Sequence, residues 1–154
     1  MNDSAVNIAF PQHGLATIKY RAESVFQDAP ENYGTFDLGE DTRSPNQILS
    51  HICDVLTFVV RKLDPQNTHH PSPKIDSWNS QIRHFLRTLE EADRAIASNT
   101  SLTTDTAHRL LQGPMADVLT HVGQLAMLRR CAGTPIEGQN FFRADIKPIN
   151  PEDL

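Results

Sequence analysis

Residues 113–133 carry the strongest helix signal in the chain, and this signal limits the folds that the chain can adopt. Apolar residues recur here at the three- and four-residue spacing of one helix face. They are Met115, Val118, Val122 and Leu125. Arg129 and Arg130 suit the negative end of a helix, and Gly133 supplies a left-handed stop. We therefore predict one long amphipathic helix over residues 114–132.

The N-terminal part of the chain predicts another amphipathic helix. Pro11 suits the first turn of a helix, where its missing N–H has no partner to lose, and residues 1–10 show no clear period. We expect residues 1–10 to form a loose lead-in and the helix to end near Asp28. Residues 29–43 follow as a long connection. Three side chains should fix this connection to the body: Tyr33, Phe36 and Leu38.

Two further helices have recognisable starts. Residues 44–47, Ser-Pro-Asn-Gln, match a capping box with proline at the first helical position. Asp64-Pro65 ends this helix, because proline disfavours helical geometry in the residue before it. The next helix is predicted over residues 76–97, with Asp76 or Ser77 as its cap.

A shorter segment, capped by Thr103 or Thr104, leads into the long C-terminal helix. Gly113-Pro114 predicts a kink or a short break at the junction. Four substantial helices with one long first connection predict an all-α four-helix bundle, which should occupy residues 1–154 as one domain. Residues 134–154 should form an extended tail with three possible anchors: Phe141, Phe142 and Ile146.

Composition narrows the function classes. The formal net charge of -5 argues against a general nucleic-acid binder, which needs a basic face. No apolar run approaches the length that spans a bilayer, and the first residues lack the pattern of a signal peptide. Cys53 and Cys131 form no spaced pattern, so we expect two buried free thiols and a cytoplasmic protein.

One face of the C-terminal helix carries the side chains best suited to bind a metal ion or take part in catalysis. Asp117 and His121 are four residues apart and Gln124 follows three later, so the three side chains share that face. His51, at the edge of the apolar arc of the second helix, is a third candidate ligand. Two histidines and one carboxylate leave positions open for water or substrate, which is typical of a catalytic divalent site.

Two supporting residues and two simpler interpretations remain open. Gln124 could orient a ligand or a bound water. Asp54 could do the same for His51, or could itself be the ligand. Alternatively, Asp117 and His121 form a plain surface ion pair, and Asp54 is a solvated aspartate.

The remaining histidines have no partner at ligand spacing. We expect His69-His70 in a solvated, proline-rich linker, His84 at the margin of its helix and His108 on a wet face. No serine has the flanking glycines of a nucleophile elbow, and no phosphate loop or dinucleotide fingerprint is present.

Two stretches of the chain resemble the DinB-like superfamily. The first is Ser44-Pro45-x-x-Ile48-Leu49-x-His51-Ile52. The second is Gly113-Pro114-x-Ala116-Asp117-x-Leu119-Thr120-His121-Val122-Gly123-Gln124-Leu125, followed by Leu128-Arg129-Arg130-x-Ala132-Gly133. That family is a four-helix bundle, often dimeric, which binds a divalent metal, commonly nickel or zinc, through three histidines. Members with known activity include transferases and isomerases that use low-molecular-weight thiols.

The resemblance assigns the ligands residue by residue. The family's histidine on the second helix matches His51, and the second histidine of its His-x-x-x-His pair matches His121. Asp117 stands where the family has the first histidine of that pair. Since a carboxylate can also ligate, the resemblance implies a site of His51, Asp117 and His121 for nickel or zinc, with manganese or iron as further options. The same substitution could instead change the metal preference, or weaken or abolish the site.

These observations favour a metal-dependent enzyme, either a hydrolase or a low-molecular-weight-thiol S-transferase, that acts on a small molecule and forms a homodimer. Its ion would lower the pKa of a bound water or thiol. The open side of the site should be lined by residues 29–43 and by Asn140-Phe141-Phe142. The alternative is a dimeric bundle without catalytic activity, which serves a binding or structural role. Its metal site would be degenerate, or would only hold the helices together. A ligand-binding regulator is a third class.

Overall fold

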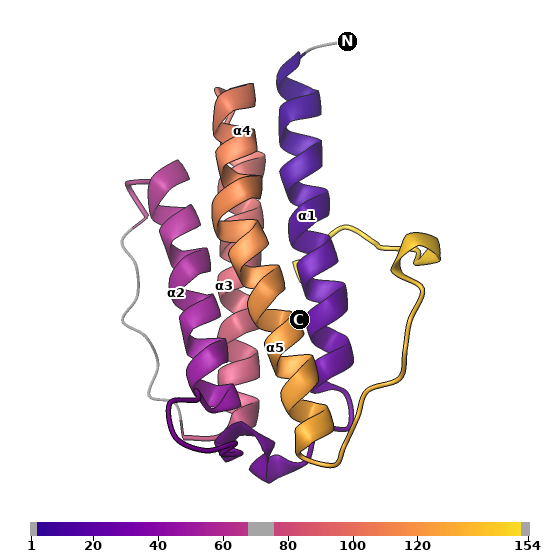
Figure 1. Cartoon of the computed structure of the whole chain (residues 1–154). Coiled ribbons are helices and arrows are strands. Elements are labelled where there is room, and N and C mark those ends of the chain that lie inside the picture. Colours follow the sequence, from indigo (N-terminus) through magenta and orange to yellow (C-terminus); the bar gives the residue numbers. More distant parts are fainter. Residues whose placement is uncertain (1–2, 68–75, 152–154) are drawn as a thin grey trace.

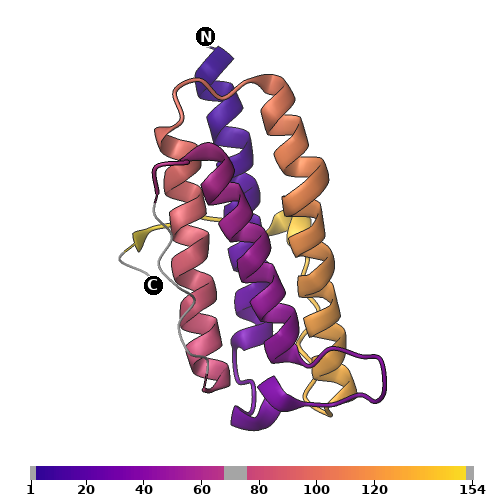
Figure 2. The same ribbon diagram turned by 90° about the vertical axis from the view of Figure 1, so that its left-hand side faces the viewer.

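The structure is a computed structural model that describes residues 3–67 and 76–151. Helices run side by side along one axis, as Figures 1 and 2 show from two directions. They are α1 (Asp3–Phe26), α2 (Pro45–Leu63), α3 (Trp78–Ser98), α4 (Thr104–Leu110) and α5 (Ala116–Cys131). A π-helical turn, η2 (Leu111–Met115), joins α4 to α5. The predicted all-α fold is confirmed, and the described residues contain no strand.

The long helices α1, α2, α3 and α5 surround one core, and the short α4 packs against α1. α1 contacts α3 and α5, and α2 contacts the same two helices from the other side. The core contains Leu15, Ile18, Leu49, Ile52, Leu56, Phe85, Leu89, Val118 and Leu125, all buried. Within the described residues, no helix has both the length and the apolar content needed to cross a bilayer.

Side-chain caps set the starts of the central helices, as the sequence predicts. Ser44 and Gln47 form the reciprocal capping box of α2, with the Ser44 amide donating to Gln47 Oε1 at 2.8 Å. Ser77, and not Asp76, caps α3, and Thr103 caps α4. α2 ends at Leu63, directly before Asp64-Pro65.

The N-terminal helix begins earlier than predicted. Residues from Asp3 onward are helical, and Pro11 lies buried inside α1, so the expected loose lead-in over residues 1–10 is wrong. Proline removes one backbone hydrogen bond from a helix interior. Burial of Pro11 and packing of Ile8 against the core favour the longer helix.

The regular α-helix is interrupted at Gly113-Pro114, as the sequence predicts, and the interruption takes the form of a π-helical turn. The chain passes through both residues in the wider π-helical turn, which accommodates a proline that cannot donate to the preceding turn. The turn places Met115 in the core against α1. Met115 packs closely over Gly14: a Cβ atom at position 14 would lie 2.0 Å from Met115 Cε, so a larger residue there would push the end of the methionine side chain aside.

Arg129 joins the C-terminal end of α5 to the C-terminal end of α1. Its guanidinium is buried and donates to the backbone carbonyls of Val25, Gln27 and Asp28. The Nε–H donates to the carbonyl of Thr134 at 2.9 Å. These carbonyls lie at helix ends and have no partner within the helix, so the buried cation supplies what the backbone lacks.

The connection between α1 and α2, residues 27–44, packs across the same end of the bundle. It contains a 3-10 helix, η1 (Glu31–Thr35), in which Tyr33 is buried and donates from its hydroxyl to the Leu125 carbonyl. Phe36 packs against the core as predicted. Leu38 does not, because 46% of its surface is exposed.

Two of the smaller predictions about burial are wrong, those for Cys131 and His84, and two are confirmed. Cys53 is buried as expected, and burial raises the pKa of its thiol to about 12, but Cys131 at the end of α5 is exposed. His84 is buried in α3, not at its margin, whereas His108 is exposed as predicted. His69-His70 lies outside the described residues.

One of the three expected tail anchors makes a well-defined aromatic contact. Phe141, in the 3-10 helix η3 (Phe141–Arg143), contacts Tyr20 edge-on with 6.4 Å between ring centroids. Ile146 is half-buried, and Phe142 is 99% exposed, so the prediction is wrong for Phe142.

Replacing Arg129 by methionine should destabilise the fold strongly. The variant keeps the apolar stem but leaves buried carbonyls without donors, so we expect a loss of about 2–4 kcal/mol in the free energy of unfolding. Urea denaturation measures this loss. Arg130→Met is the matched control, because Arg130 is exposed and its replacement should change stability by less than about 0.5 kcal/mol. Equal effects of the two variants would contradict the role given to Arg129.

Candidate metal centre

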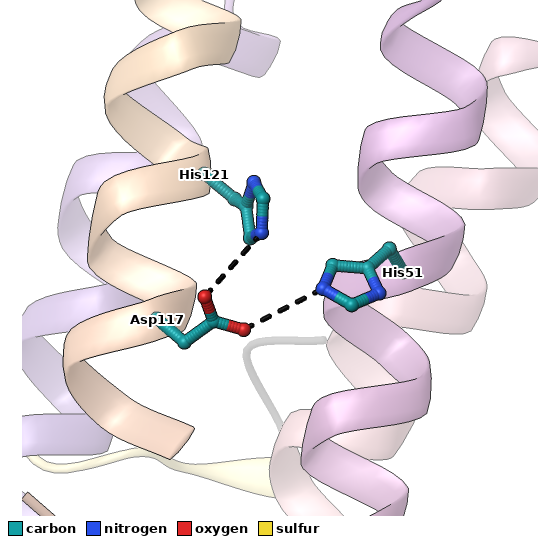
Figure 3. A group of neighbouring side chains, drawn as sticks. All are labelled: His51, Asp117 and His121. Carbon is teal, nitrogen blue, oxygen red and sulfur yellow. Dashed lines mark ion pairs between the residues drawn. The ribbon is translucent and has the colours of Figure 1, made fainter. Parts of the chain in front are cut away.

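His51, Asp117 and His121 meet at the seam between α2 and α5 (Figure 3). Asp117 lies between the two imidazoles and directs one oxygen toward each. His51 Nε2 is 3.5 Å from Asp117 Oδ2, and His121 Nε2 is 3.5 Å from Asp117 Oδ1. The three ligand atoms lie within 4.8 Å of one another. The structure therefore brings together the three residues that the sequence predicts as ligands.

Apolar neighbours on both helices hold these side chains at the edge of the core. On α2, Ile48 and Ile52 are buried on either side of His51 along the helix. On α5, the buried Val118 and Val122 directly follow Asp117 and His121. The two imidazole rings cross almost at right angles, at 86°, with 4.7 Å between their centroids.

Gln124 determines how His121 faces the cluster. Its Oε1 is 2.8 Å from His121 Nδ1, so with the amide in this orientation Nδ1–H donates to Gln124. The neutral ring then has its lone pair on Nε2, facing Asp117. This is the arrangement expected of a metal-ligating histidine whose other nitrogen is held by a polar neighbour.

The spacing of the ligand atoms leaves room for a shared cation between two different oxygens of Asp117 and the two imidazoles. The 3.5 Å separations are longer than normal hydrogen bonds between nitrogen and oxygen. Two ligand atoms bound to one zinc-sized ion at tetrahedral angles lie about 3.4 Å apart. A lone pair on His121 Nε2 and a carboxylate oxygen repel each other unless a proton or a metal cation lies between them. Two imidazoles and one carboxylate form a donor set that can hold a divalent metal ion.

Solvent reaches the cluster. The exposed fractions of the side chains are 36% for His51, 46% for Asp117 and 14% for His121. Two grooves adjoin it. The first, of about 490 Å³, lies between residues 38–43 and α5 and includes His121 and Gln124. The second, of about 720 Å³, includes Asp117 and lies between α2 and the π-helical turn. A cluster closed over by apolar side chains would have none of this access.

Of the two residues expected to support the ligands, Gln124 lies beside one of them and Asp54 does not belong to the ligand group. Gln124 is beside His121, as the prediction that it orients a ligand requires. Asp54 is exposed, lines the second groove and lies outside the ligand group that the described residues form.

The predicted lining of the site is half right. Residues 38 and 41–43 of the connection line the first groove. Asn140-Phe141-Phe142 does not, and this expectation is wrong. Phe141 packs against Tyr20 and Arg21 of α1, and it lines a different cavity between α1 and α5 whose lining includes none of the three ligand residues.

Two residues beside the site were missed by the sequence analysis. Phe58 lines the second groove with 57% of its surface exposed. Its position on the polar side of an otherwise regular amphipathic helix was the available signal. Arg43 lines the first groove, and a single arginine in a connection gives no comparable signal.

Comparisons with protein-family models, curated proteins and solved structures found no match to this chain.

Replacing Gln124 by leucine should weaken metal binding without unfolding the protein, since Gln124 is exposed. Loss of the acceptor frees His121 to adopt either neutral tautomer, and removal of such an outer partner lowers affinity by about 10- to 100-fold. Competition for zinc with a chromophoric chelator measures the change. Gln66→Leu, at an exposed turn, is the control. An unchanged zinc affinity in Gln124→Leu would show that Gln124 does not support the site.

Proposed function

We propose that this chain is a metal-dependent enzyme of the DinB-like type, a hydrolase or a low-molecular-weight-thiol S-transferase. One observation carries the proposal: two histidines and a carboxylate from two helices place their ligand atoms within 4.8 Å of one another at a solvent-accessible seam. The family assignment is supported by the sequence motifs, whose histidine and aspartate positions lie on α2 and α5 at this seam.

His51, Asp117 and His121 would hold a single divalent ion. Two imidazoles and one carboxylate suit nickel or zinc, and also manganese or iron, because geometry and availability decide occupancy more than affinity does. An ion in such a site acts as a Lewis acid and lowers the pKa of a water or thiol. Gln124 holds His121 in the tautomer that presents Nε2, and Asp117 offsets the charge of the ion.

Access to the cluster favours catalysis over a purely structural site. A metal that only staples two helices is typically enclosed by its protein ligands, whereas a catalytic metal keeps a position open. Asp117 is 46% exposed, and grooves adjoin it and His121. We further propose that the protein works as a cytoplasmic homodimer on a small molecule. The family resemblance supports the dimer, and two free cysteines agree with a reducing compartment.

Metal analysis of the tag-free protein tests the proposal. The wild type should contain near one equivalent of nickel, zinc, manganese or iron after purification or reconstitution. His51→Ala and His121→Ala should each reduce this to a small fraction, because two remaining ligands hold a divalent ion weakly. His108→Ala is the matched control, since His108 is exposed on α4 outside the cluster. Ester-hydrolysis and thiol-transfer assays with the bound metal then separate the two activities.

The opposite result has a definite meaning. A wild type that is empty and takes up none of the four metals would show that aspartate at position 117 has abolished the site. The chain would then be a binding or structural bundle.

A further inference from the structure

The first groove contains charges that the metal centre does not use. Asp41 and Arg43 both line it, together with His121 and Gln124 of α5. Both charged residues are exposed. Among the described residues, neither takes part in an ion pair, with the other or with a third group. One positive and one negative side chain are therefore available on the same wall.

The backbone on either side fixes this wall. Thr42 closes a turn by donating from its amide and its hydroxyl to the Gly39 carbonyl, at 3.3 and 2.7 Å. Asp41 adopts a positive φ of 62° within that turn. Arg43 directly precedes Ser44, which the capping box holds at the start of α2. The two charged residues thus project from a segment with defined geometry.

Apart from these charges, Thr42 and the two polar residues of α5, the lining of the groove is apolar. Leu38, Ile48, Met127 and Leu128 contribute to its lining. A ligand that spans the groove would place a polar group at the charges, an aliphatic stem on the apolar floor and a metal-binding group beside His121. Sites of this kind gain orientation from a few polar groups and contact area from apolar ones.

We infer that the substrate carries an amino-acid-type zwitterion, with its carboxylate bound by Arg43 and its ammonium group bound by Asp41. Arginine matches a carboxylate with two parallel donors, and aspartate accepts from an ammonium group. Binding both groups selects against molecules that carry only one charge, because a lone carboxylate is repelled by Asp41. The inference rests on the proposed function, since the other end of the substrate must reach the metal.

Three hydroxamates that differ only at the far end test this inference. Pentanohydroxamate carries neither charge, glutarate monohydroxamate carries a carboxylate, and glutamate γ-monohydroxamate carries the zwitterion. Each is titrated at pH 7 into the cobalt(II)-loaded protein, and the visible absorption of cobalt reports binding. We expect the wild type to bind the zwitterionic probe about tenfold more tightly than the uncharged one.

Two charge variants separate the contributions of Arg43 and Asp41. Arg43→Gln should bind the zwitterionic and uncharged probes about equally. Asp41→Asn should bind the zwitterionic and carboxylate-only probes about equally. Arg83→Gln makes the same charge change as Arg43→Gln at an exposed site on α3, and it should behave like the wild type. Cobalt content should be unchanged in all three variants.

The contrary outcomes are distinguishable. Equal binding of the three probes to a cobalt-loaded wild type would overturn the zwitterion inference and leave the metal centre standing. Equal loss in Arg43→Gln and Arg83→Gln would also overturn it, by showing that only overall charge matters. A wild type that takes up no cobalt would overturn the proposed metal centre and, with it, this inference.

Discussion

The buried guanidinium of Arg129 is the interaction on which the arrangement of the site depends. It donates to carbonyls at the end of α1 and to Thr134 beyond the end of α5, so it fixes how far α5 extends along α1. Tyr33 adds a bond from the connection to the Leu125 carbonyl one turn earlier in α5. His121 lies one further turn upstream on the same helix. Its position relative to α2 and to residues 38–43 therefore follows from this junction.

The cluster of His51, Asp117 and His121 shows how a bundle can hold charge at the edge of its core. An unpaired carboxylate is costly to bury, and Asp117 remains the most exposed of the three ligand residues. His121 is the most buried of the three, and its Nδ1 forms a hydrogen bond with Gln124 Oε1. Exposure thus rises from His121 through His51 to Asp117. The face of the cluster that is open to a water or a substrate is the face where the charge lies.

Features that depend on neighbouring residues were predictable from the sequence. Ser44, Ser77 and Thr103 cap helices because their side chains reach backbone N–H groups three residues ahead. The shared face of Asp117 and His121 follows from helical spacing alone. Asp117 and His121 can meet His51 once α2 and α5 pack side by side. A four-helix bundle allows this packing of helices that are distant in the sequence.

Features that depend on tertiary packing were not predictable in the same way. Pro11 looked like a helix start because its burial within α1 could not be known from local rules. Gly113-Pro114 disfavours a regular α-helix, but local rules do not say whether the chain then kinks, breaks or widens into the π-helical turn that places Met115 in the core. The tail was misplaced because contacts of Phe141 with α1 position it. No periodic pattern encodes such contacts.

The most direct test of the metal centre is anomalous diffraction from crystals of the protein soaked in a zinc salt, recorded on both sides of the zinc absorption edge. The structure predicts one strong peak bounded by His51 Nε2, His121 Nε2 and the carboxylate of Asp117. A peak at another site, or no peak between these three residues in crystals that contain zinc, would contradict the account.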